Sequence, residues 1–301
     1  MKARFRCPFR LTRHLDEAVV GTQSAYNIPV PWGIVLGANQ SQSIPFPAFS
    51  TVAPYLTADN ANYNALQAVL TKHVSHGLQF SASYTFAKNL GTQSWLSDPR
   101  NYKLDYGPLP NDLRDVVTVN AIYRLPFGKG QRWSPSNAIA RTLVGGWTAS
   151  SIFSFRTGFG FNPVIATTDL LMLNGNHVED KPDVICSGSQ PGRNFNNWYN
   201  GSCFVVPTEP TTVGAPLREG DVGIDSLRGP HATTQDFGLS KISTIKEHTT
   251  FEIRAEAFNL WNHTVLGLPN YFLAPPAPPF TGITYVDETP RLIQIAAKLS
   301  F

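Results

Sequence analysis

The sequence predicts an all-β protein built on an antiparallel up-and-down sheet, and three observations lead to this fold class. Apolar and polar residues alternate with a period of two over several segments, as they do along strands with two unlike faces. The chain of 301 residues contains 23 Gly and 24 Pro, which favour turns, and 12% aromatic residues, which favour strands. Charged residues make up only 15%, whereas an average soluble domain has about 25%.

Seven strands are expected from residue 62 onward. The clearest alternation runs through residues 251–257, where Phe, Ile and Ala residues share one face and charged residues share the other. The same pattern predicts further strands near residues 66–71, 78–86, 117–125, 147–156, 236–245 and 293–301. Between the first two of these strands, Ser75-His76-Gly77 reads as a hairpin turn, because Gly adopts a positive φ at little cost.

The connections between these strands are sorted by length. Compact connections at residues 75–77, 126–141 and 246–248 alternate with long ones at residues 89–112, 157–235 and 259–290. Short periplasmic turns and long extracellular loops are typical of outer-membrane barrels. The sequence therefore predicts an antiparallel up-and-down transmembrane β-barrel wall of about seven or eight strands, with long extracellular loops.

The same alternation has a second explanation. An antiparallel sheet with one solvent-exposed side also alternates apolar and polar residues. A soluble or surface-attached β-sandwich that serves as a binding or adhesion module therefore stays the alternative. The sorted connections favour the barrel, because a sandwich has no reason to keep its long connections at one end.

One predicted strand carries a row of charges. Glu252, Arg254 and Glu256 lie on one face at steps of roughly 7 Å, so that the arginine can compensate both carboxylates. We expect these three residues to be lumen-facing charges of the barrel, rather than an acid–base pair for catalysis.

Residues 1–61 form a poorly defined amino-terminal segment, and residues 62–301 form the predicted barrel part. Residues 26–36 could hold a strand interrupted by prolines, and the proline-rich residues 43–54 are expected to be loop. The first 20 residues are basic, but charges interrupt any apolar stretch, so we expect no signal peptide there.

No pattern in the chain indicates an enzyme, a cofactor or a metal. The G-x-S-x-G, Walker A and dinucleotide-binding patterns are absent, and His73 and His76 flank a hairpin turn rather than sharing a helix face. The net charge of +3 is too small and too dilute to predict nucleic-acid binding. No apolar run approaches the 18 residues of a membrane-spanning helix.

Several segments resemble a known family. The most specific are RAEAFNLWNHT at residues 254–264 and the terminal PRLIQIAAKLSF; others are residues 62–90, 112–133, 145–163 and 227–241. Together they resemble the carboxyl-terminal barrel portion of TonB-dependent, Oar-like outer-membrane receptors, the carboxypeptidase-regulatory-like-domain-containing family of Acidobacteria-type genomes. The resemblance covers most of residues 62–301.

This resemblance implies a location in the cell outer membrane and a role in the uptake of a ligand whose identity it does not give. It also implies a plug domain and a TonB-contacting segment, neither of which we recognise in this sequence. Because plugged outer-membrane transporters have about 22 strands, we expect an incomplete barrel wall, a fragment that meets the TonB complex only through parts it lacks. Outer-membrane lipid and the barrel-assembly machinery are the other expected partners.

The resemblance also implies roles for two sets of residues. Outer-membrane barrels commonly end in a strand with alternating apolar residues and a terminal aromatic, which the assembly machinery reads; Ile295, Ala297, Leu299 and Phe301 match this pattern. Spacing alone leaves the three cysteines either unpaired or with one pair. Similar receptors carry a cysteine pair in the corresponding loop, which favours a disulfide between Cys186 and Cys203 on the oxidising exterior.

Overall fold

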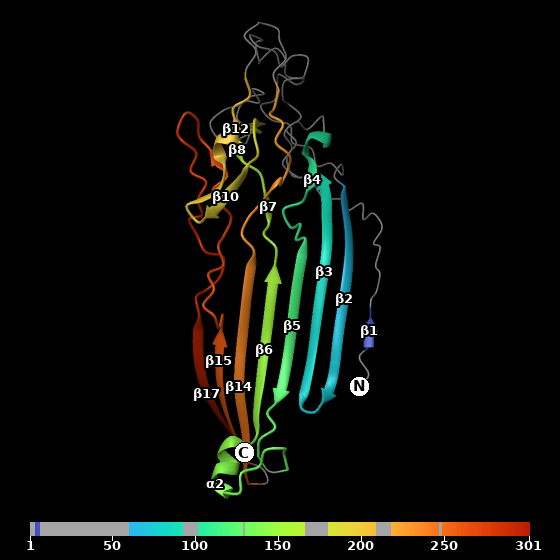
Figure 1. Cartoon of the computed structure of the whole chain (residues 1–301), viewed down its shortest axis with the longest axis vertical. Helices are drawn as coiled ribbons and strands as arrows, with labels where there is room; N and C mark the ends of the chain where they lie inside the picture. Colours follow the sequence, from blue (N-terminus) through green and yellow to red (C-terminus); the bar gives the residue numbers. More distant parts are fainter. Residues whose placement is uncertain are drawn as a thin grey trace, which may run out of the picture.

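A computed structural model describes residues 4–6, 60–92, 102–128, 130–165, 180–208, 218–246 and 249–301 of the chain. Its main feature is a nine-stranded antiparallel sheet in the order β1-β2-β3-β5-β6-β14-β15-β17, with β4 also paired to β3 (Figure 1). The seven long strands are β2 (Ala61–Ser75), β3 (Leu78–Thr92), β5 (Asp115–Arg124), β6 (Trp147–Arg156), β14 (Ala232–Lys246), β15 (Thr249–Phe258) and β17 (Leu292–Ser300). Two short strands, β1 (Arg4–Arg6) and β4 (Tyr106–Pro108), extend it.

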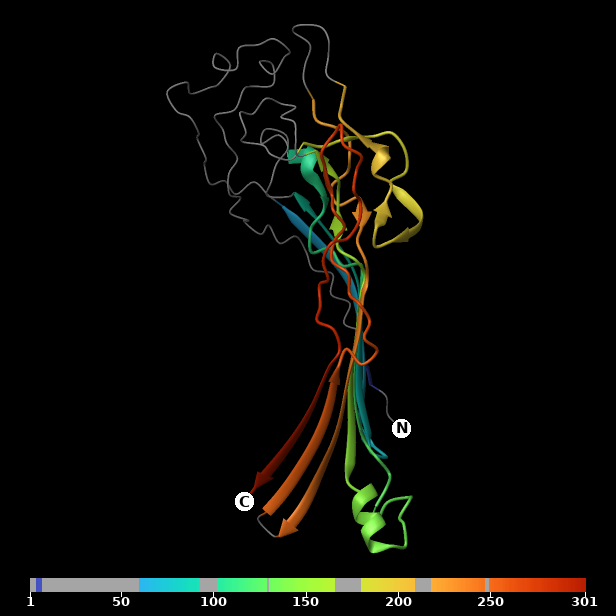
Figure 2. The same ribbon diagram turned by 90° about the vertical axis from the view of Figure 1, so that its left-hand side faces the viewer.

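The sheet is a single twisted layer that does not close. The strands β1 and β17 lie at opposite ends of the strand order and do not pair with each other. Figure 2 shows β2, β3, β5 and β6 nearly edge-on, with β14, β15 and β17 bending away to the left in the same layer. The predicted all-β, incomplete barrel wall with seven long strands is therefore confirmed.

The ends of this wall differ as the sequence predicts. The connections from β3 to β5, β6 to β14 and β15 to β17 extend from the upper end in Figure 1, whereas those from β2 to β3 and β5 to β6 lie at the lower end. The carboxyl terminus also lies near the lower end (Figure 1).

The β2–β3 connection is the hairpin turn expected at residues 75–77. His76 and Gly77 have φ values of 52° and 80°, and two consecutive positive φ angles are characteristic of a type I′ turn. A Cβ at Gly77 would lie 2.7 Å from the carbonyl oxygen of Arg124. The adjacent strand thus restricts this position to glycine as strongly as the turn does.

The β5–β6 connection contains a short helix that the sequence analysis did not predict. The helix α2 (Ala138–Val144) is capped by Asn137, whose side-chain oxygen accepts hydrogen bonds from the backbone N–H groups of Ile139 and Ala140. None of its residues is buried. The helix lies at the lower end of the wall, below β6 (Figure 1).

The long connections fold together over the upper end of the wall. We refer to the described residues of this part (102–114, 157–165, 180–208, 218–231 and 259–291) as the loop layer. Besides β4, it contains the following short elements: η1 (Tyr102–Asp105), β7 (Gly160–Phe161), β8 (Val164–Ile165), β9 (Asp183–Val184), β10 (Ser189–Asn194), β11 (Asn197–Tyr199), η2 (Gly201–Cys203), β12 (Phe204–Val205), β13 (Leu227–Arg228) and β16 (Phe272–Leu273). They pair as β10 with β11, β9 with β12, β7 with β13 and β8 with β16.

The loop layer has a hydrophobic core of its own. Its buried cluster consists of Phe161, Tyr199, Cys203, Phe204, Val222 and Leu273. Tyr199 makes edge contacts with the rings of Phe161 and Phe204, with centroids 5.5 and 5.8 Å apart. The core residues come from the second and third long connections, and by excluding water together they hold these two connections as one folded unit.

Residues 26–36 and 43–54, where the sequence suggested a possible strand and a loop, lie outside the described residues. From the amino-terminal 61 residues, the structure describes only β1 and residues 60–61. Strand β1 pairs antiparallel with β2, with Phe5 opposite Leu70. The boundary between residues 61 and 62 stays a prediction.

Candidate functional site

The two faces of the wall differ in chemistry along most of its long strands. One register row across the sheet contains Leu78, Tyr123, Ala149, Leu239, Ala255 and Ile295. The adjacent row, which points to the opposite face, contains Gln79, Ile122, Ser150, Gly238, Glu256 and Gln294. We call these the apolar face and the polar face. The apolar face suits lipid, and the polar face suits a water-filled lumen.

The three charges predicted to face the lumen lie on the polar face in β15. Arg254 forms ion pairs with Glu252 at 2.8 Å and with Glu256 at 3.5 Å. On β17, Gln294 donates a hydrogen bond to Glu256, and Lys298 lies opposite Glu252 in register. The carboxylates are therefore neutralised within a charge ladder, which suits a lumen lining better than proton transfer.

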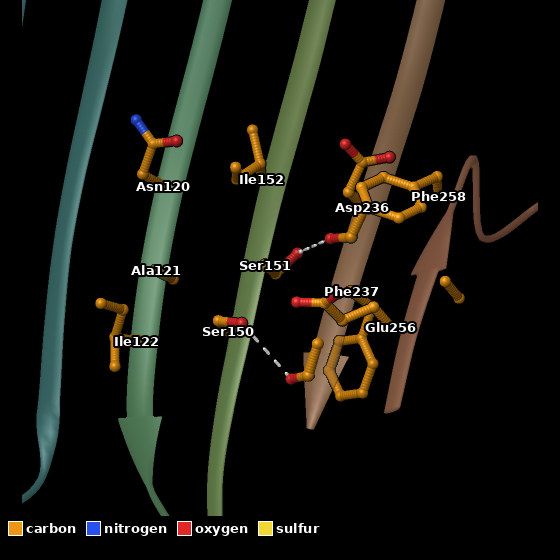
Figure 3. Close-up of a pocket in the computed structure, with 12 residues that line it drawn as sticks. Asn120, Ala121, Ile122, Ser150, Ser151, Ile152, Asp236, Phe237, Glu256 and Phe258 are labelled. Atoms are coloured by element: carbon orange, nitrogen blue, oxygen red, sulfur yellow. Dashed lines mark hydrogen bonds between the residues drawn. The ribbon is translucent and has the colours of Figure 1, made fainter. Parts of the chain in front are cut away.

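Beside this ladder, the polar face has a hollow of about 270 Å³ over β5, β6, β14 and β15. Gly238 lies in its lining between Ser150 and Glu256, and a Cβ there would come within 2.6 Å of the Ser150 hydroxyl oxygen. Figure 3 shows its polar side chains, which include Asn120, Ser150, Asp236 and Glu256, next to Ile122, Ile152 and Phe258. Most of the surface that lines the hollow is apolar, so its few hydroxyl, amide and carboxylate groups offer water isolated hydrogen-bond partners.

The residues expected to form an assembly signal lie on the last strand, at the edge of the wall. Ile295 and Leu299 lie on the apolar face opposite Ala255 and Phe251, and Ala297 lies opposite Ile253. Ile295 is 76% exposed, and Phe301, just beyond the end of β17, is 96% exposed. The signal residues are thus accessible to another protein, although their recognition stays a prediction.

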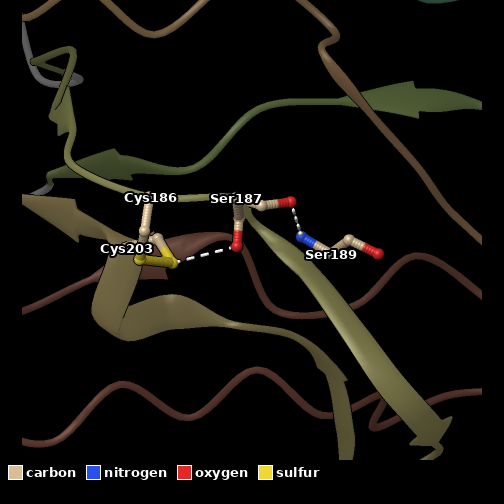
Figure 4. The surroundings of a disulfide bond; sticks show 4 residues. All are labelled: Cys186, Ser187, Ser189 and Cys203. Atoms are coloured by element: carbon tan, nitrogen blue, oxygen red, sulfur yellow. Dashed lines mark hydrogen bonds between the residues drawn. A yellow bond between two sulfur atoms is a disulfide. The ribbon is translucent and has the colours of Figure 1, made fainter.

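In the loop layer, the structure joins Cys186 to Cys203 in a disulfide with Cα atoms 4.9 Å apart (Figure 4). Cys203 is fully buried within the core, and its sulfur lies 3.0 Å from the carbonyl oxygen of Ser187. Ser187 also accepts a hydrogen bond from the backbone N–H of Ser189 at 3.3 Å (Figure 4). The Cys186–Cys203 disulfide thereby links the core of the loop layer to the strand pair β10–β11.

Replacing both cysteines by serine is expected to destabilise the loop layer by about 3 kcal/mol, because the bond closes a loop of 17 residues and restricts the unfolded chain. The urea dependence of proteolysis of the loop layer in the membrane-bound chain measures this change. Cys7→Ser is the control, since it removes a cysteine outside the disulfide. Equal urea midpoints for the double variant and the control would contradict the prediction.

Two ion pairs connect the loop layer internally and to the wall. Lys181 pairs with Asp105 at 2.8 Å, and these side chains are only 7% and 1% exposed. Arg228 pairs with Asp112, whose other carboxylate oxygen accepts a hydrogen bond from the backbone N–H of Asn89 in β3 at 2.6 Å. The second pair therefore fixes the loop layer to the upper end of the wall.

The electrostatics of the loop layer perturb two further groups. Arg218 donates two hydrogen bonds to the carboxylate of Asp183, at 2.7 and 2.6 Å, and this bidentate contact lowers the pKa of Asp183. Burial raises the pKa of the Tyr199 hydroxyl, which donates a hydrogen bond to the carbonyl oxygen of Asn270. Both groups therefore keep their usual charge at neutral pH, and neither resembles a catalytic acid or base.

Other kinds of site are not found in the described part of the chain. It contains no group of three or more His, Cys, Asp or Glu residues arranged to hold a metal ion. Within the same residues, no helix has the length and apolarity needed to cross a bilayer. His76 lies in the hairpin turn, where its Nδ1 is 2.9 Å from the hydroxyl of Ser75.

A single-layer antiparallel wall with unlike faces and sorted connections defines a transmembrane barrel of the outer-membrane type. Residues 13–294 match the family described as "outer membrane beta barrel domain", and the chain belongs to this family. No curated protein and no solved structure matches the chain. Family membership confirms the outer-membrane barrel and makes the protein an outer-membrane component.

Proposed function

We propose that this chain is the carboxyl-terminal barrel part of a TonB-dependent, Oar-like receptor that takes up a ligand across the outer membrane, without catalysing a reaction. The open sheet is the observation that carries this proposal. Every residue of β17 from Leu292 to Leu299 is exposed, and β17 has one strand neighbour in the described sheet. Because a bilayer does not tolerate an unpaired strand edge, such a wall requires further strands, as in a large transporter barrel.

The family resemblance supports the same function. Residues 62–90 contain nearly all of β2 and β3, residues 145–163 contain β6, and residues 290–301 contain β17. The similar segments therefore cover most of the wall, and some of them, such as residues 254–264, continue into the loop layer. In this proposal the charge ladder faces the lumen, and the TonB complex acts through a plug that belongs to the complete receptor.

The β-sandwich alternative receives no support from the packing. A sandwich buries one face of each sheet against the other sheet, whereas large side chains of the apolar face, such as Ile293, Ile295 and Leu299, are more than half exposed. Exposure of this kind suits lipid contact. The loop layer covers only the end of the wall (Figure 2).

Cross-linking in the native cell tests the receptor role. A tagged form of the chain is expected in the outer-membrane fraction, cross-linked to TonB and to a polypeptide with a plug domain. A tagged periplasmic protein is the control for unspecific cross-linking. Recovery in the outer membrane without either partner would contradict the receptor role, and a soluble, monodisperse chain in plain buffer would favour the sandwich.

Deletion of Phe301 is expected to lower the amount of inserted protein several-fold, because the assembly machinery would lose the terminal aromatic of its signal. Heat-modifiable mobility in the outer-membrane fraction measures insertion. Phe301→Tyr, which keeps an aromatic side chain, should insert normally. Insertion of the deletion variant at the level of the Tyr variant would show that Phe301 is not read.

A further inference from the structure

The helix α2 lies against the apolar face of the wall. Two side chains of this face hold its carboxyl-terminal carbonyl groups: Trp147 Nε1 donates to the carbonyl oxygen of Leu143 at 2.9 Å, and Lys241 Nζ donates to the same oxygen at 3.0 Å. Trp147 and Lys241 are register partners in β6 and β14, and Lys241 lies over the Trp147 ring at 5.6 Å. In Figure 2, β14, β15 and β17 bend to one side of the sheet, and α2 lies on the opposite side. The helix is thus fixed beside the lower margin of the apolar face.

Several large apolar side chains of this connection are exposed. Ile139 and Leu143, one turn apart in α2, are 72% and 65% exposed, and Trp133 just before the helix is 59% exposed. Val144 is also exposed. These exposed apolar side chains belong to a connection that Trp147 and Lys241 hold against the apolar face.

The charge of the connection has one sign. Residues 125–146 contain three basic residues and no acidic residue. Arg132 is exposed, Arg141 is partly exposed, and Lys241 lies at the end of the helix. Apolar, aromatic and basic side chains together are typical of segments that lie in the headgroup region of a bilayer.

We propose that the β5–β6 connection is an interfacial anchor that lies in the leaflet on the short-turn side and binds anionic phospholipid headgroups. Ile139, Leu143 and Trp133 enter the boundary between headgroups and acyl chains, and Arg132 and Arg141 contact the phosphates. Two observations favour lipid over a protein as the occupant: Trp147 and Lys241 hold the connection against the apolar face, and its charge is complementary to anionic headgroups. This anchor goes beyond a role in transport and sets the depth of the wall in the bilayer.

Site-specific fluorescence tests the anchor in the full chain. In a Cys7→Ser background, an environment-sensitive fluorophore is placed at Leu143→Cys, at Ile295→Cys on the apolar face, or at Ile185→Cys in the loop layer. Ile185 is a matched control, because it is 65% exposed like Leu143 but lies in the layer at the opposite end of the wall. Each labelled chain is reconstituted into vesicles of phosphatidylcholine, with or without phosphatidylglycerol, that contain a headgroup-depth spin-labelled lipid.

The probe at Leu143 is expected to be blue-shifted and quenched by the spin-labelled lipid, whereas the probe at Ile185 stays aqueous. Each of the variants Arg132→Gln and Arg141→Gln should lower about five-fold the ratio of chains whose β5–β6 connection contacts lipid to chains whose connection stays in water. This effect is expected only in vesicles that contain phosphatidylglycerol. An aqueous probe at Leu143 beside a quenched probe at Ile295 would overturn the anchor. If quenching at Leu143 were the same with and without phosphatidylglycerol and in both arginine variants, the contact with anionic headgroups would be overturned. An unquenched probe at Ile295 would overturn the lipid-facing wall on which the anchor depends.

Discussion

Replacing Lys181 by Met is expected to destabilise the loop layer by about 3–5 kcal/mol, because the change removes the ammonium group that pairs with the buried carboxylate of Asp105. The Lys181 ammonium group also donates a hydrogen bond to the carbonyl oxygen of Leu104 at 2.6 Å, so η1 loses two contacts. Asp105 and Lys181 belong to different long connections. Their separation should therefore expose the loop layer to protease at much lower urea concentrations.

Two controls separate buried charge from lost packing. The double variant Asp105→Leu, Lys181→Met should recover most of the lost stability, since apolar residues of similar volume often replace a buried ion pair without loss. Arg218→Met removes one side of the Asp183 pair, whose arginine is 55% exposed, and should cost about 0–1 kcal/mol. Equal losses for Lys181→Met and Arg218→Met would show that burial does not strengthen the first pair.

The wall could be predicted from the sequence because alternation with a period of two reports directly on a strand with two unlike faces. Phe251, Ile253 and Ala255 share the apolar face with their β17 partners in register, as the pattern predicts. The hairpin at His76 and Gly77 follows in the same way from local turn chemistry. In each case the physical cause lies within a few neighbouring residues.

The loop layer was missed for the opposite reason. Several of its strands have only two residues, such as β7 and β16, which is too short for alternation to be visible. Its core joins residues as distant as Phe161, Tyr199 and Leu273. Only the aromatic residues near Cys203 offered a signal, because Trp198, Tyr199 and Phe204 are unusual for an exposed loop.

The helix α2 lies between these cases. Asn137 and the pair Ile139 and Leu143, four residues apart, are a recognisable cap and apolar face, but seven residues are too few for a stable isolated helix. Its last turn depends on Lys241, nearly 100 residues later in the chain. Local pattern could therefore suggest this helix, and only the fold could place it on the apolar face.

The assignment of faces leads to the sharpest test of the wall. Ala82→Arg is expected to destabilise the inserted protein by about 2–4 kcal/mol, because it would place a cation among Leu70 and Val119 on the apolar face, where lipid cannot solvate it. Urea unfolding in phospholipid vesicles measures the change in the free energy of unfolding.

The adjacent Ser81→Arg is the matched control, because its register partners Thr71 and Asn120 lie on the polar face. There a guanidinium group meets water and polar side chains, so the free energy of unfolding of this variant should stay close to that of the unsubstituted protein. The two substitutions add the same side chain one residue apart in the same strand, so strand propensity and backbone position hardly differ between them. Equal losses of stability in the two variants would contradict a wall with one lipid-facing and one lumen-facing side. A loss of stability confined to Ala82→Arg would assign the apolar face to lipid.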